Sequence, residues 1–355
     1  MRCFGDNREG QLGAGPRARR RGPVDVPGIG DAVEVVAGET FSCARLTGGG
    51  VRCWGSNRRG QLGDDSRAIE RAKPAPVRGL SDAVQLAAGA RHVCARRVGG
   101  EVVCWGDDTS GELGQGSRPA RPVSLPAGCS RMGRQVCCSA PPGSRFSVFC
   151  RPYKTYVDRH DGAFFRRAHS RVPVPVAGLS DAAFIAAGDS FSCALRRGGQ
   201  LRCWGENGHR QLRDDATAQL RAPIVIPGLS PASAIAARAS TLCARRRAGA
   251  IVCQGIERPD AASCARLRGV AGPLALQPGR ICVLRRRGGL ACAGAGLAFG
   301  VTARDLDDVV EAASGHFHAC VRKRGGTVLC WGNNESGQLG GGTRRQRGRV
   351  TLLGL

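Results

Sequence analysis

The amino-acid sequence predicts an all-β fold in which a four-stranded antiparallel sheet is repeated around a ring, as in a β-propeller. All four tryptophans of the 355-residue chain lie in the same tripeptide, Cys-Trp-Gly, and a second phrase, Gly-Gln-Leu-Gly or a close variant, follows most of these tripeptides. Cysteines aligned on this tripeptide recur every 38 to 53 residues. A period of this length is typical of a propeller blade or of a helical repeat.

The residues inside one repeat favour the propeller. In residues 23–63, four short runs of β-forming residues, Val24–Val26, Ala32–Val36, Phe41–Ala44 and Val51–Trp54, are separated by turns that contain glycine or proline. Such runs form a meandering antiparallel sheet, and no segment shows sustained helical periodicity with caps. A sheet of this size buries its two faces only against neighbouring sheets, as propeller blades do.

Two kinds of turn recur between these runs. A glycine lies five residues before the first cysteine of most repeats, and we expect it at a turn or bulge with positive φ, which glycine adopts without strain. An asparagine or aspartate three residues before another glycine indicates a second turn, which we expect to differ where Arg210 replaces the glycine. The first set is Gly38, Gly89, Gly133, Gly188 and Gly315, and the second is Asn7, Asn57, Asp108, Asn207 and Asn334.

These residues resemble a known family. The phrases Cys-Trp-Gly-x-Asn-x-x-Gly-Gln-Leu-Gly and Ala-Gly-x-x-x-x-Cys-Ala look like the regulator of chromosome condensation repeat in its bacterial form. The resemblance covers nearly the whole chain and implies a seven-bladed β-propeller, in line with seven complete units in the sequence. We therefore predict a single domain over residues 1–355, with degenerate blades near 121–171 and 258–299, where the cysteines remain and most other repeat positions are lost.

The two ends of the chain carry parts of a further unit. Met1–Asn7 matches the last strand of a repeat, and Val350–Leu355 matches a first strand. Either the gene start is clipped or these ends pair to close the ring. Met1 leads directly into a repeat, without the basic segment and apolar core of a signal peptide.

The cysteines predict stapled hairpins. Six pairs share a spacing of ten residues across a glycine-rich turn, and a seventh pair has a spacing of twelve. Opposed residues in such a hairpin lie about 4.5 Å apart at Cα, within reach of a disulfide that would stabilise the fold by about 2.5–3 kcal/mol. Reduced structural thiols are the alternative, whereas zinc fits poorly because no Cys-x-x-Cys spacing occurs. The candidate pairs are Cys43 with Cys53, Cys94 with Cys104, Cys138 with Cys150, Cys193 with Cys203, Cys243 with Cys253, Cys282 with Cys292, and Cys320 with Cys330.

The net charge of +25 comes almost entirely from arginine. The hairpin tips between paired cysteines are rich in basic residues, and equivalent tips emerge on one face of a propeller. A positive ring there could bind nucleic-acid phosphates, another polyanion or an acidic protein. The alternative is a solvated surface produced by codon bias. The predicted partner-binding residues at the tips are Arg96, Arg97, Arg196, Arg197, Arg245, Arg246, Arg247, Arg285, Arg286, Arg287, Arg322, Lys323 and Arg324.

Residues 145–171 depart from the repeat and are rich in aromatic residues and arginine. Residues 145–171 hold both tyrosines, Tyr153 and Tyr156, together with Phe165 and several arginines. Aromatic residues interleaved with arginine are typical of binding loops at protein interfaces or on single-stranded nucleic acid. We predict partner binding by these three aromatic residues, with a decayed repeat whose aromatics fill a poorly packed blade as the alternative.

Enzymatic motifs are missing from the sequence. His92 and His318 occupy one repeat position and are predicted to be structural. No phosphate-binding loop, nucleophile elbow or zinc-binding helix occurs, and a metal site formed by His160, Asp161 and His169 is only a remote option. We expect no cofactor, no metal and no enzymatic activity. No apolar run reaches the ~18–20 residues that cross a membrane, and we expect a monomer.

The sequence therefore predicts a non-catalytic scaffold that displays loops on one propeller face to an unidentified protein partner, with an acidic surface as one option for that partner. Paired cysteines favour an extracellular or periplasmic location. The family resemblance also implies precedents for a guanine-nucleotide exchange factor, so a cytoplasmic GTPase regulator is the main alternative. Binding of nucleic acid or another polyanion through the arginine-rich rim is a weaker one.

The paired-cysteine hypothesis predicts that twelve to fourteen of the eighteen cysteines are protected from alkylation before reduction. Intact-mass measurement on protein from its native source, alkylated before and after reduction, counts them. Eighteen free thiols would contradict the exported, stapled form and favour the cytoplasmic alternative.

Overall fold

The computed structural model describes residues 1–15, 22–116, 129–132, 135–139, 148–152, 169–213, 218–256, 258–277, 280–285, 288–294, 303–315, 318–342 and 347–352. The chain forms two compact units. The larger unit consists of residues 1–116 and 169–355, and the smaller one of residues 117–168.

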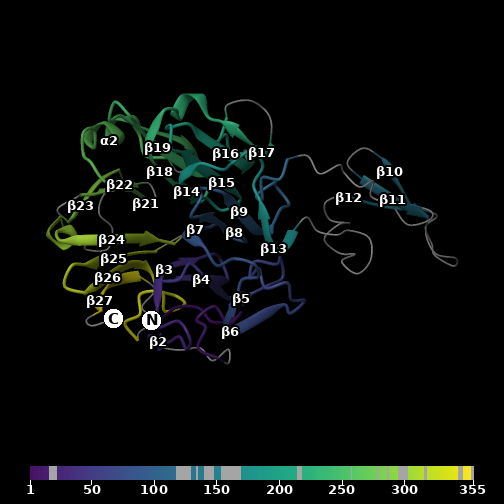
Figure 1. The fold of residues 1–355 in the computed structure, drawn as a ribbon, viewed down its shortest axis with the longest axis horizontal. Coiled ribbons are helices and arrows are strands. Elements are labelled where there is room, and N and C mark those ends of the chain that lie inside the picture. Colours follow the sequence, from purple (N-terminus) through teal and green to yellow (C-terminus); the bar gives the residue numbers. More distant parts are fainter. Residues whose placement is uncertain are drawn as a thin grey trace. The chain divides into compact units, whose positions relative to one another are not determined.

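Six antiparallel meanders follow one another along the larger unit (Figure 1). The first consists of β3 (Ala32–Ala37), β4 (Phe41–Leu46), β5 (Val51–Ser56) and β6 (Glu70–Pro76), and the second of β7 (Ala83–Ala88), β8 (His92–Arg97), β9 (Val102–Asp107) and β13 (His169–Pro175). The third consists of β14 (Ala182–Ala187), β15 (Phe191–Arg196), β16 (Leu201–Glu206) and β17 (Gln219–Val225). The fourth consists of β18 (Ala232–Arg238), β19 (Thr241–Arg246) and β20 (Ile251–Gly255), and the fifth of β21 (Leu274–Gln277), β22 (Arg280–Leu284) and β23 (Leu290–Gly294). The sixth consists of β24 (Val309–Ser314), β25 (His318–Lys323), β26 (Val328–Asn333) and β27 (Arg347–Leu352).

Few other elements accompany these sheets. β1 (Arg2–Cys3) and β2 (Val24–Asp25) form a two-stranded sheet, and α2 (Ala261–Arg266) is a short α-helix between β20 and β21. Two 3₁₀ turns occupy Pro227–Leu229 and Ala303–Leu306. Among the described residues, no helix is long and apolar enough to cross a membrane.

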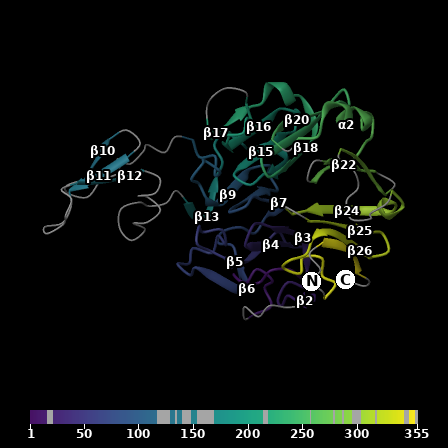
Figure 2. The same cartoon turned by 180° about the vertical axis from the view of Figure 1, so that it is seen from behind.

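The larger unit is a β-propeller with six blades, and the prediction of seven is wrong. The first strands of the sheets are innermost and pack against one another in chain order, from β3 through β7, β14, β18 and β21 to β24 (Figures 1 and 2). Because β14 packs directly against β7, residues 117–168 do not supply a blade between them. That segment keeps cysteines but lacks the Cys-Trp-Gly and Gly-Gln-Leu-Gly phrases that join one blade to the next.

The chain ends do not pair with each other. β1 pairs with β2, and β27 pairs with β26 as the fourth strand of the sixth blade. The C-terminal strand therefore completes the blade before it, instead of starting a further one as the sequence suggested.

Disulfides close the central hairpin of every blade. The six cysteine pairs with ten-residue spacing lie directly opposite each other in the register of the second and third strands. Each pair is bonded, with Cα atoms 4.0–4.1 Å apart. The short Cα separation follows from the register, because non-hydrogen-bonded positions bring opposed residues closest. The bonded pairs are Cys43 with Cys53, Cys94 with Cys104, Cys193 with Cys203, Cys243 with Cys253, Cys282 with Cys292, and Cys320 with Cys330.

The tryptophans join neighbouring blades. The indole nitrogen of Trp105 donates a hydrogen bond of 3.0 Å to the main-chain oxygen of Gln61 in the preceding repeat. The same contact links Trp54 to Gln11 and Trp204 to Glu112. All three indoles are fully buried, so the donor would otherwise lack a partner at a cost of about 1–3 kcal/mol.

The glycine that ends Gly-Gln-Leu-Gly makes room for that indole. A β-carbon on Gly63 would lie 2.9 Å from the Trp105 ring, and the φ of this glycine is +64°. No other residue type meets both conditions. The Cys-Trp-Gly and Gly-Gln-Leu-Gly phrases are therefore the two halves of one contact between blades.

The asparagine turn is confirmed and repeats the same hydrogen bonds. In the second repeat, Asn57 Oδ1 accepts from the main-chain nitrogen of Leu62 at 3.1 Å, and Gln61 Oε1 accepts from that of Arg59 at 2.7 Å. The leucine between these bonds is buried. Equivalent bonds to leucine are made by Asn7, Asp108, Asn207 and Asn334.

The glycine before each first cysteine has a different role from the one predicted. Gly38, Gly89, Gly188 and Gly315 do not have positive φ. A β-carbon on Gly38 would lie 2.0 Å from the ring of Phe41, and one on Gly89 would lie 2.2 Å from the ring of His92. Glycine is needed because an aromatic ring on the next strand covers its Cα.

The smaller unit contains a three-stranded sheet of β10 (Cys129–Met132), β11 (Gln135–Ser139) and β12 (Val148–Pro152). Its backbone register places Cys137 opposite Cys150, and Cys138 opposite both Cys129 and Phe149. The pairing of Cys138 with Cys150 stays a prediction, although the backbone register places Cys137 opposite Cys150. A pair spaced by twelve residues does not share the register of pairs spaced by ten.

Replacing Arg210 by glycine is expected to stabilise the protein. Arg210 keeps the turn of the other repeats, but with φ +55°, where the equivalent glycines have φ +75° to +89°. An arginine in this region costs about 1–2 kcal/mol, partly offset by the entropy of glycine. We expect Arg210→Gly to raise the free energy of unfolding by about 0.5–1 kcal/mol in urea denaturation with the disulfides intact.

The control places a side chain on the equivalent glycine of the first blade. A β-carbon on Gly60 would lie 2.6 Å from the main-chain oxygen of Ser170, so Gly60→Ala should lower the urea midpoint. A lower midpoint for Arg210→Gly would show that the left-handed conformation carries no cost here.

Candidate functional site

The turns between the first and second strands meet at the axis of the propeller. Their main chains are joined from blade to blade, since the nitrogen of each turn donates to a main-chain oxygen of the next. At the fourth blade the guanidinium of Arg238 continues the series, with Nη2 3.2 Å from the oxygen of Gly315. The main-chain bonds are Glu39 to Ala90 at 3.0 Å, Ala90 to Asp189 at 2.9 Å and Asp189 to Ala239 at 2.9 Å.

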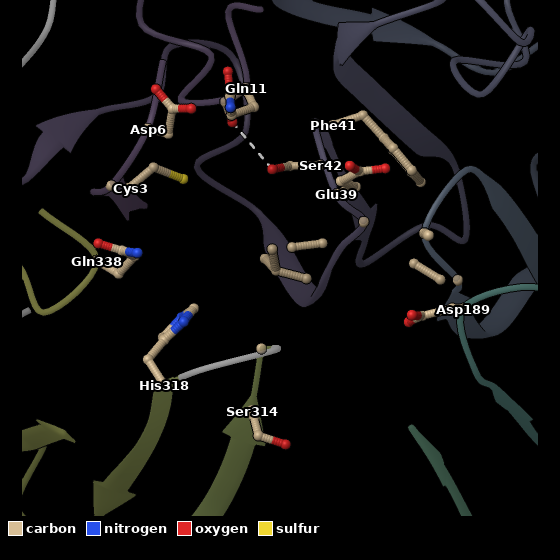
Figure 3. Close-up of a pocket in the computed structure, with 18 of the residues that line it drawn as sticks. Cys3, Asp6, Gln11, Glu39, Phe41, Ser42, Asp189, Ser314, His318 and Gln338 are labelled. Carbon is tan, nitrogen blue, oxygen red and sulfur yellow. Dashed lines mark hydrogen bonds between the residues drawn. The ribbon is translucent and has the colours of Figure 1, made fainter. Parts of the chain in front are cut away.

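These turns line a pocket of about 640 Å³. Figure 3 shows Cys3 and Gln338 at the left of it, Ser42 and Glu39 at the top, Asp189 at the right and His318 below Gln338. Ser42 Oγ donates to the main-chain oxygen of Gln11 at 3.0 Å, which ties the first blade to the N-terminal segment. The lining mixes carboxylates, amides, guanidinium groups and a thiol with apolar side chains, most of which are alanines.

Cys3 is not an activated nucleophile in this pocket. Burial raises the pKa of the Cys3 thiol to about 11, against a smaller opposite effect of the N-terminal charge. The thiol is therefore protonated at neutral pH and a weak nucleophile. Among the described residues, no group of His, Cys, Asp and Glu side chains could hold a metal ion.

A histidine–serine pair lies deeper, between the second and third blades. His92 Nε2 is 2.7 Å from Ser192 Oγ, and both side chains are 1% exposed. Burial lowers the pKa of His92 to about 4, and the charge of Asp107 opposes this shift. The pair has the residue types of a base and a nucleophile, but it is closed to solvent and bridges two blades.

The predicted ring of positive charge at the hairpin tips is interrupted by carboxylates. Arg97 Nε lies 2.9 Å from Asp82, and Arg196 Nε lies 2.6 Å from Asp181. Both acids stand directly before the first strand of their blades.

The sixth blade repeats this pairing. Arg322 Nε lies 3.0 Å from Glu311, and Arg324 Nε lies 3.1 Å from Asp308. Since the acids again lie at the start of the first strand, most of the rim carries paired charge.

The tips of the fourth and fifth blades are different. At the equivalent positions, counted back from the first cysteine of the pair, the fourth blade has Pro231 and Ala234, and the fifth has Val270 and Pro273, so neither blade supplies an acid. Residues 218–294 contain twelve arginines and two acidic residues, Glu257 and Asp260. The tip arginines of the fourth blade bond main-chain oxygens, which leaves their charge uncompensated by carboxylates among the described residues.

Main-chain contacts hold the fourth-blade tip against its neighbours, among them the loop that follows α2. Arg245 Nη1 donates to the oxygen of Val270 at 2.9 Å, and Arg247 Nη2 donates to Gly198 at 2.9 Å. The loop after α2 reaches the fifth blade, and the helix itself packs against β20 and β23 (Figures 1 and 2). We call Arg245, Arg246, Arg247, Arg266, Arg268 and Arg285 the arginine cluster; all are exposed except Arg245, which is half-buried.

The arginine cluster contains only some of the residues that the sequence predicted to bind a partner at the hairpin tips. Arg245, Arg246, Arg247 and Arg285 were predicted from the tips, whereas Arg266 and Arg268 were missed because α2 lies outside the repeat. The loss of acids at Pro231 and Val270 was a usable signal in the sequence. The predicted residues Arg286, Arg287, Tyr153, Tyr156 and Phe165 lie outside the described residues.

One buried carboxyl departs from the repeat. Glu112 stands where other repeats have glutamine, is 3% exposed and accepts a hydrogen bond of 2.7 Å from the main-chain nitrogen of Ser110. Burial raises its pKa to about 8, helped by the charges of Asp107 and Asp108 and opposed by main-chain hydrogen bonds. Glu112 is therefore mainly neutral at pH 7 and acts as a glutamine substitute in the turn.

Taken together, these contacts define a tandem-repeat β-propeller in which a tryptophan of one blade is joined to the Gly-Gln-Leu-Gly turn of the blade before it. Two family models, both of the regulator of chromosome condensation (RCC1) repeat, match the chain. One matches residues 32–61, 83–112, 183–211 and 309–338, and the other matches residues 3–45 and 48–96. The chain therefore contains RCC1 repeats in these segments; the matches do not single out a bacterial form.

One solved structure supports the propeller fold. Human WBSCR16 has a TM-score of 0.69 at 16% identity, over 100% of this chain and 96% of that one. Yeast RCC1 (Prp20) bound to Kap60, and Prp20p of Saccharomyces cerevisiae studied for its binding to Gsp1p and histones, each have a TM-score of 0.46 at 19% identity. They cover 99% of this chain and 83% and 86% of their own. No curated protein sequence matches the chain.

The buried carboxyl predicts a pH-dependent stability. The folded pKa of Glu112, about 8, exceeds its ordinary value of 4.5, so the wild-type protein loses stability relative to a neutral isostere as pH rises from about 4.5 to about 8. Glu112→Gln should change the free energy of unfolding little at pH 4. At pH 9 it should raise that free energy by about 2–4 kcal/mol, as measured by urea denaturation.

Gln61→Glu is the matched control, because Gln61 is 2% exposed and makes the same turn contacts. It should introduce a loss of stability above neutral pH. An equal stability difference between Glu112→Gln and wild type at both pH values would show that the carboxyl is not neutralised by its site.

Proposed function

We propose that this propeller is a non-catalytic protein-interaction scaffold that binds an acidic protein surface through the arginine cluster. The proposal rests on a difference between blades in the partners of the arginines at the hairpin tips. In each of four blades at least one tip arginine is held by a carboxylate of the same chain, while those of the fourth blade bond only main-chain oxygens and serine among the described residues. Uncompensated charge concentrated in one sector steers an anionic partner and fixes its orientation.

The cluster is suited to a protein partner by its rigidity. Arg245, Arg246 and Arg247 lie in a hairpin closed by the Cys243–Cys253 disulfide, and the main chain of the loop after α2 lies against that tip. Arginines held by hydrogen bonds lose less entropy on binding than free side chains do. Matched RCC1-repeat segments skip residues 212–308, as they also skip 113–182, so the sector that carries the cluster departs from the family pattern.

Six disulfides in the described residues support an exported protein, because such bonds persist in oxidising compartments. The GTPase-regulator alternative stays a prediction. Binding of nucleic acid is the second candidate, since the same arginines would contact phosphates.

The test uses polyglutamate as an acidic polypeptide probe. We expect the triple variant with Arg246→Ala, Arg247→Ala and Arg268→Ala to weaken its binding by about tenfold or more in low salt, and we expect wild-type affinity to fall as salt rises. Fluorescence anisotropy reports the affinities.

The control is the triple variant with Arg97→Ala, Arg322→Ala and Arg324→Ala, which removes the same number of charges from tips with carboxylate partners. Equal losses in the two triple variants would contradict a localised site and leave only the net charge. A mixed-sequence single-stranded oligonucleotide, measured in the same buffers, separates the two candidates. Tighter binding of the oligonucleotide than of polyglutamate would favour nucleic acid over an acidic protein.

A further inference from the structure

Three sulfur atoms meet beneath the arginine cluster. Cys243 and Cys253 are disulfide-bonded across β19 and β20. The Cys264 thiol, on α2, lies 3.8 Å from Cys253 Sγ and is part of the same buried core. Cys264 and Cys3 are the free cysteines among the described residues, and Cys264 is the one placed against a disulfide.

The position of Cys264 is set by its helix. Asp260 caps α2, with Oδ1 accepting from the main-chain nitrogen of Ser263 at 2.7 Å and Oδ2 accepting from the Ser263 hydroxyl at 2.8 Å. The helix packs against β20 and β23, so Cys264 faces the strand that carries Cys253. No other repeat places an α-helix between its third strand and the next blade among the described residues.

We propose that Cys243, Cys253 and Cys264 form a thiol–disulfide exchange relay with two covalent states. In the first state Cys253 is bonded to Cys243, and in the second it is bonded to Cys264. The relay regulates the arginine cluster, a part of the proposal that rests on the proposed function.

The exchange is balanced without an external oxidant or reductant. The Cys264 thiol gives its proton to water or hydroxide, and the thiolate attacks Cys253 Sγ. The Cys253–Cys264 bond forms as the Cys243–Cys253 bond breaks, and the electron pair leaves on Cys243 Sγ, which takes up a proton. The number of disulfides is unchanged.

The distance suits such an exchange. At 3.8 Å the two sulfurs are in van der Waals contact, and a bond of about 2.05 Å requires a shift of under about 2 Å. α2 is a single short element between two loops, so it can make that shift without breaking a blade. The exchange opens the staple between β19 and β20 and joins α2 to β20 instead.

The exchange depends on pH through Cys264. Burial raises the pKa of this thiol, and the charge of Asp260 raises it further. The strands packed against α2, β20 and β23, carry no ionisable side chain apart from disulfide-bonded cysteines. The thiolate fraction, and with it the rate of attack, therefore rises with pH.

Both halves of the arginine cluster are affected by the exchange. Arg245, Arg246 and Arg247 lie between Cys243 and Cys253 in the chain, whereas Arg266 and Arg268 follow Cys264. In the first state the Cys243–Cys253 disulfide closes the hairpin, and no disulfide joins α2 to a strand. In the second state the Cys253–Cys264 disulfide joins α2 to β20, and the hairpin tip is no longer closed by a disulfide. The spacing of the charges that a partner would contact therefore changes.

The relay is tested by disulfide mapping of the oxidised full chain. Protein incubated without reductant at pH 6 and at pH 9 is quenched in acid, unfolded, alkylated and digested. We expect a Cys253–Cys264 peptide and alkylated Cys243 to increase from pH 6 to pH 9. Cys264→Ser should show only the Cys243–Cys253 peptide at both pH values, with Cys3 alkylated throughout as the internal reference.

A second variant keeps the test independent of exchange rates. Cys243→Ser leaves Cys253 and Cys264 as the only members of the relay, and oxidised glutathione should join them. Separate glutathione adducts on the two cysteines, or a wild-type map with only Cys243–Cys253 at pH 9, would overturn the relay.

Polyglutamate affinity of the two locked variants tests the regulatory part. We expect Cys264→Ser, locked in the first state, and oxidised Cys243→Ser, locked in the second, to differ by about threefold or more. Equal affinities would remove the regulation and leave the exchange. Absence of binding by both variants and by wild type would overturn the proposed function, while the disulfide maps still decide the relay.

Discussion

The hydrogen bond from a buried indole to a main-chain oxygen of the preceding repeat is the contact on which the propeller depends. A blade of three or four strands has two faces to bury and can do so only against its neighbours. Trp54, Trp105 and Trp204 supply the largest fully buried side chains of their blades, and losing such a ring typically costs about 3–5 kcal/mol. The indole NH fixes the orientation of the ring, and the positive-φ glycine beneath it fixes the distance between blades.

The rest of each repeat holds the two ends of this contact in place. The disulfide fixes the register of the strands that carry the tryptophan, and the asparagine turn holds the Gly-Gln-Leu-Gly segment that receives it. The charged residues at the hairpin tips and at the start of the first strands take no part in these contacts, so they can differ from blade to blade. The acids that start the first strand therefore appear in most blades and are absent in the fourth and fifth, where Pro231 and Val270 take the equivalent position.

The propeller class and the local features of each repeat could be predicted from the sequence, whereas the number of blades could not. The cysteine spacing fixes a hairpin register, and the asparagine turn is made by bonds within five residues, so both were evident without a structure. The number of blades depends on whether residues 117–168 pack into the ring, which the retained cysteines did not reveal. The role of Gly38 was not evident because the ring that covers it comes from Phe41, three residues away on another strand. Tip arginines could be found because they recur, but their carboxylate partners lie on a different strand. Cys264 had no predicted partner, because its approach to Cys253 is a tertiary contact made from outside the repeat.

The disulfides also decide how the molecule would respond to tension. Each of the six closes a ten-residue loop inside one blade, and among the described residues none joins two blades. Each loop withholds about 30–35 Å of extension. The contour length of the whole chain is roughly 1,200 Å, and the six loops together remove roughly 200 Å of it from the length that force can extend. The disulfides do not resist the separation of one blade from the next. A stretched molecule would therefore unfold first at the interfaces between blades, and every hairpin would keep its register for refolding.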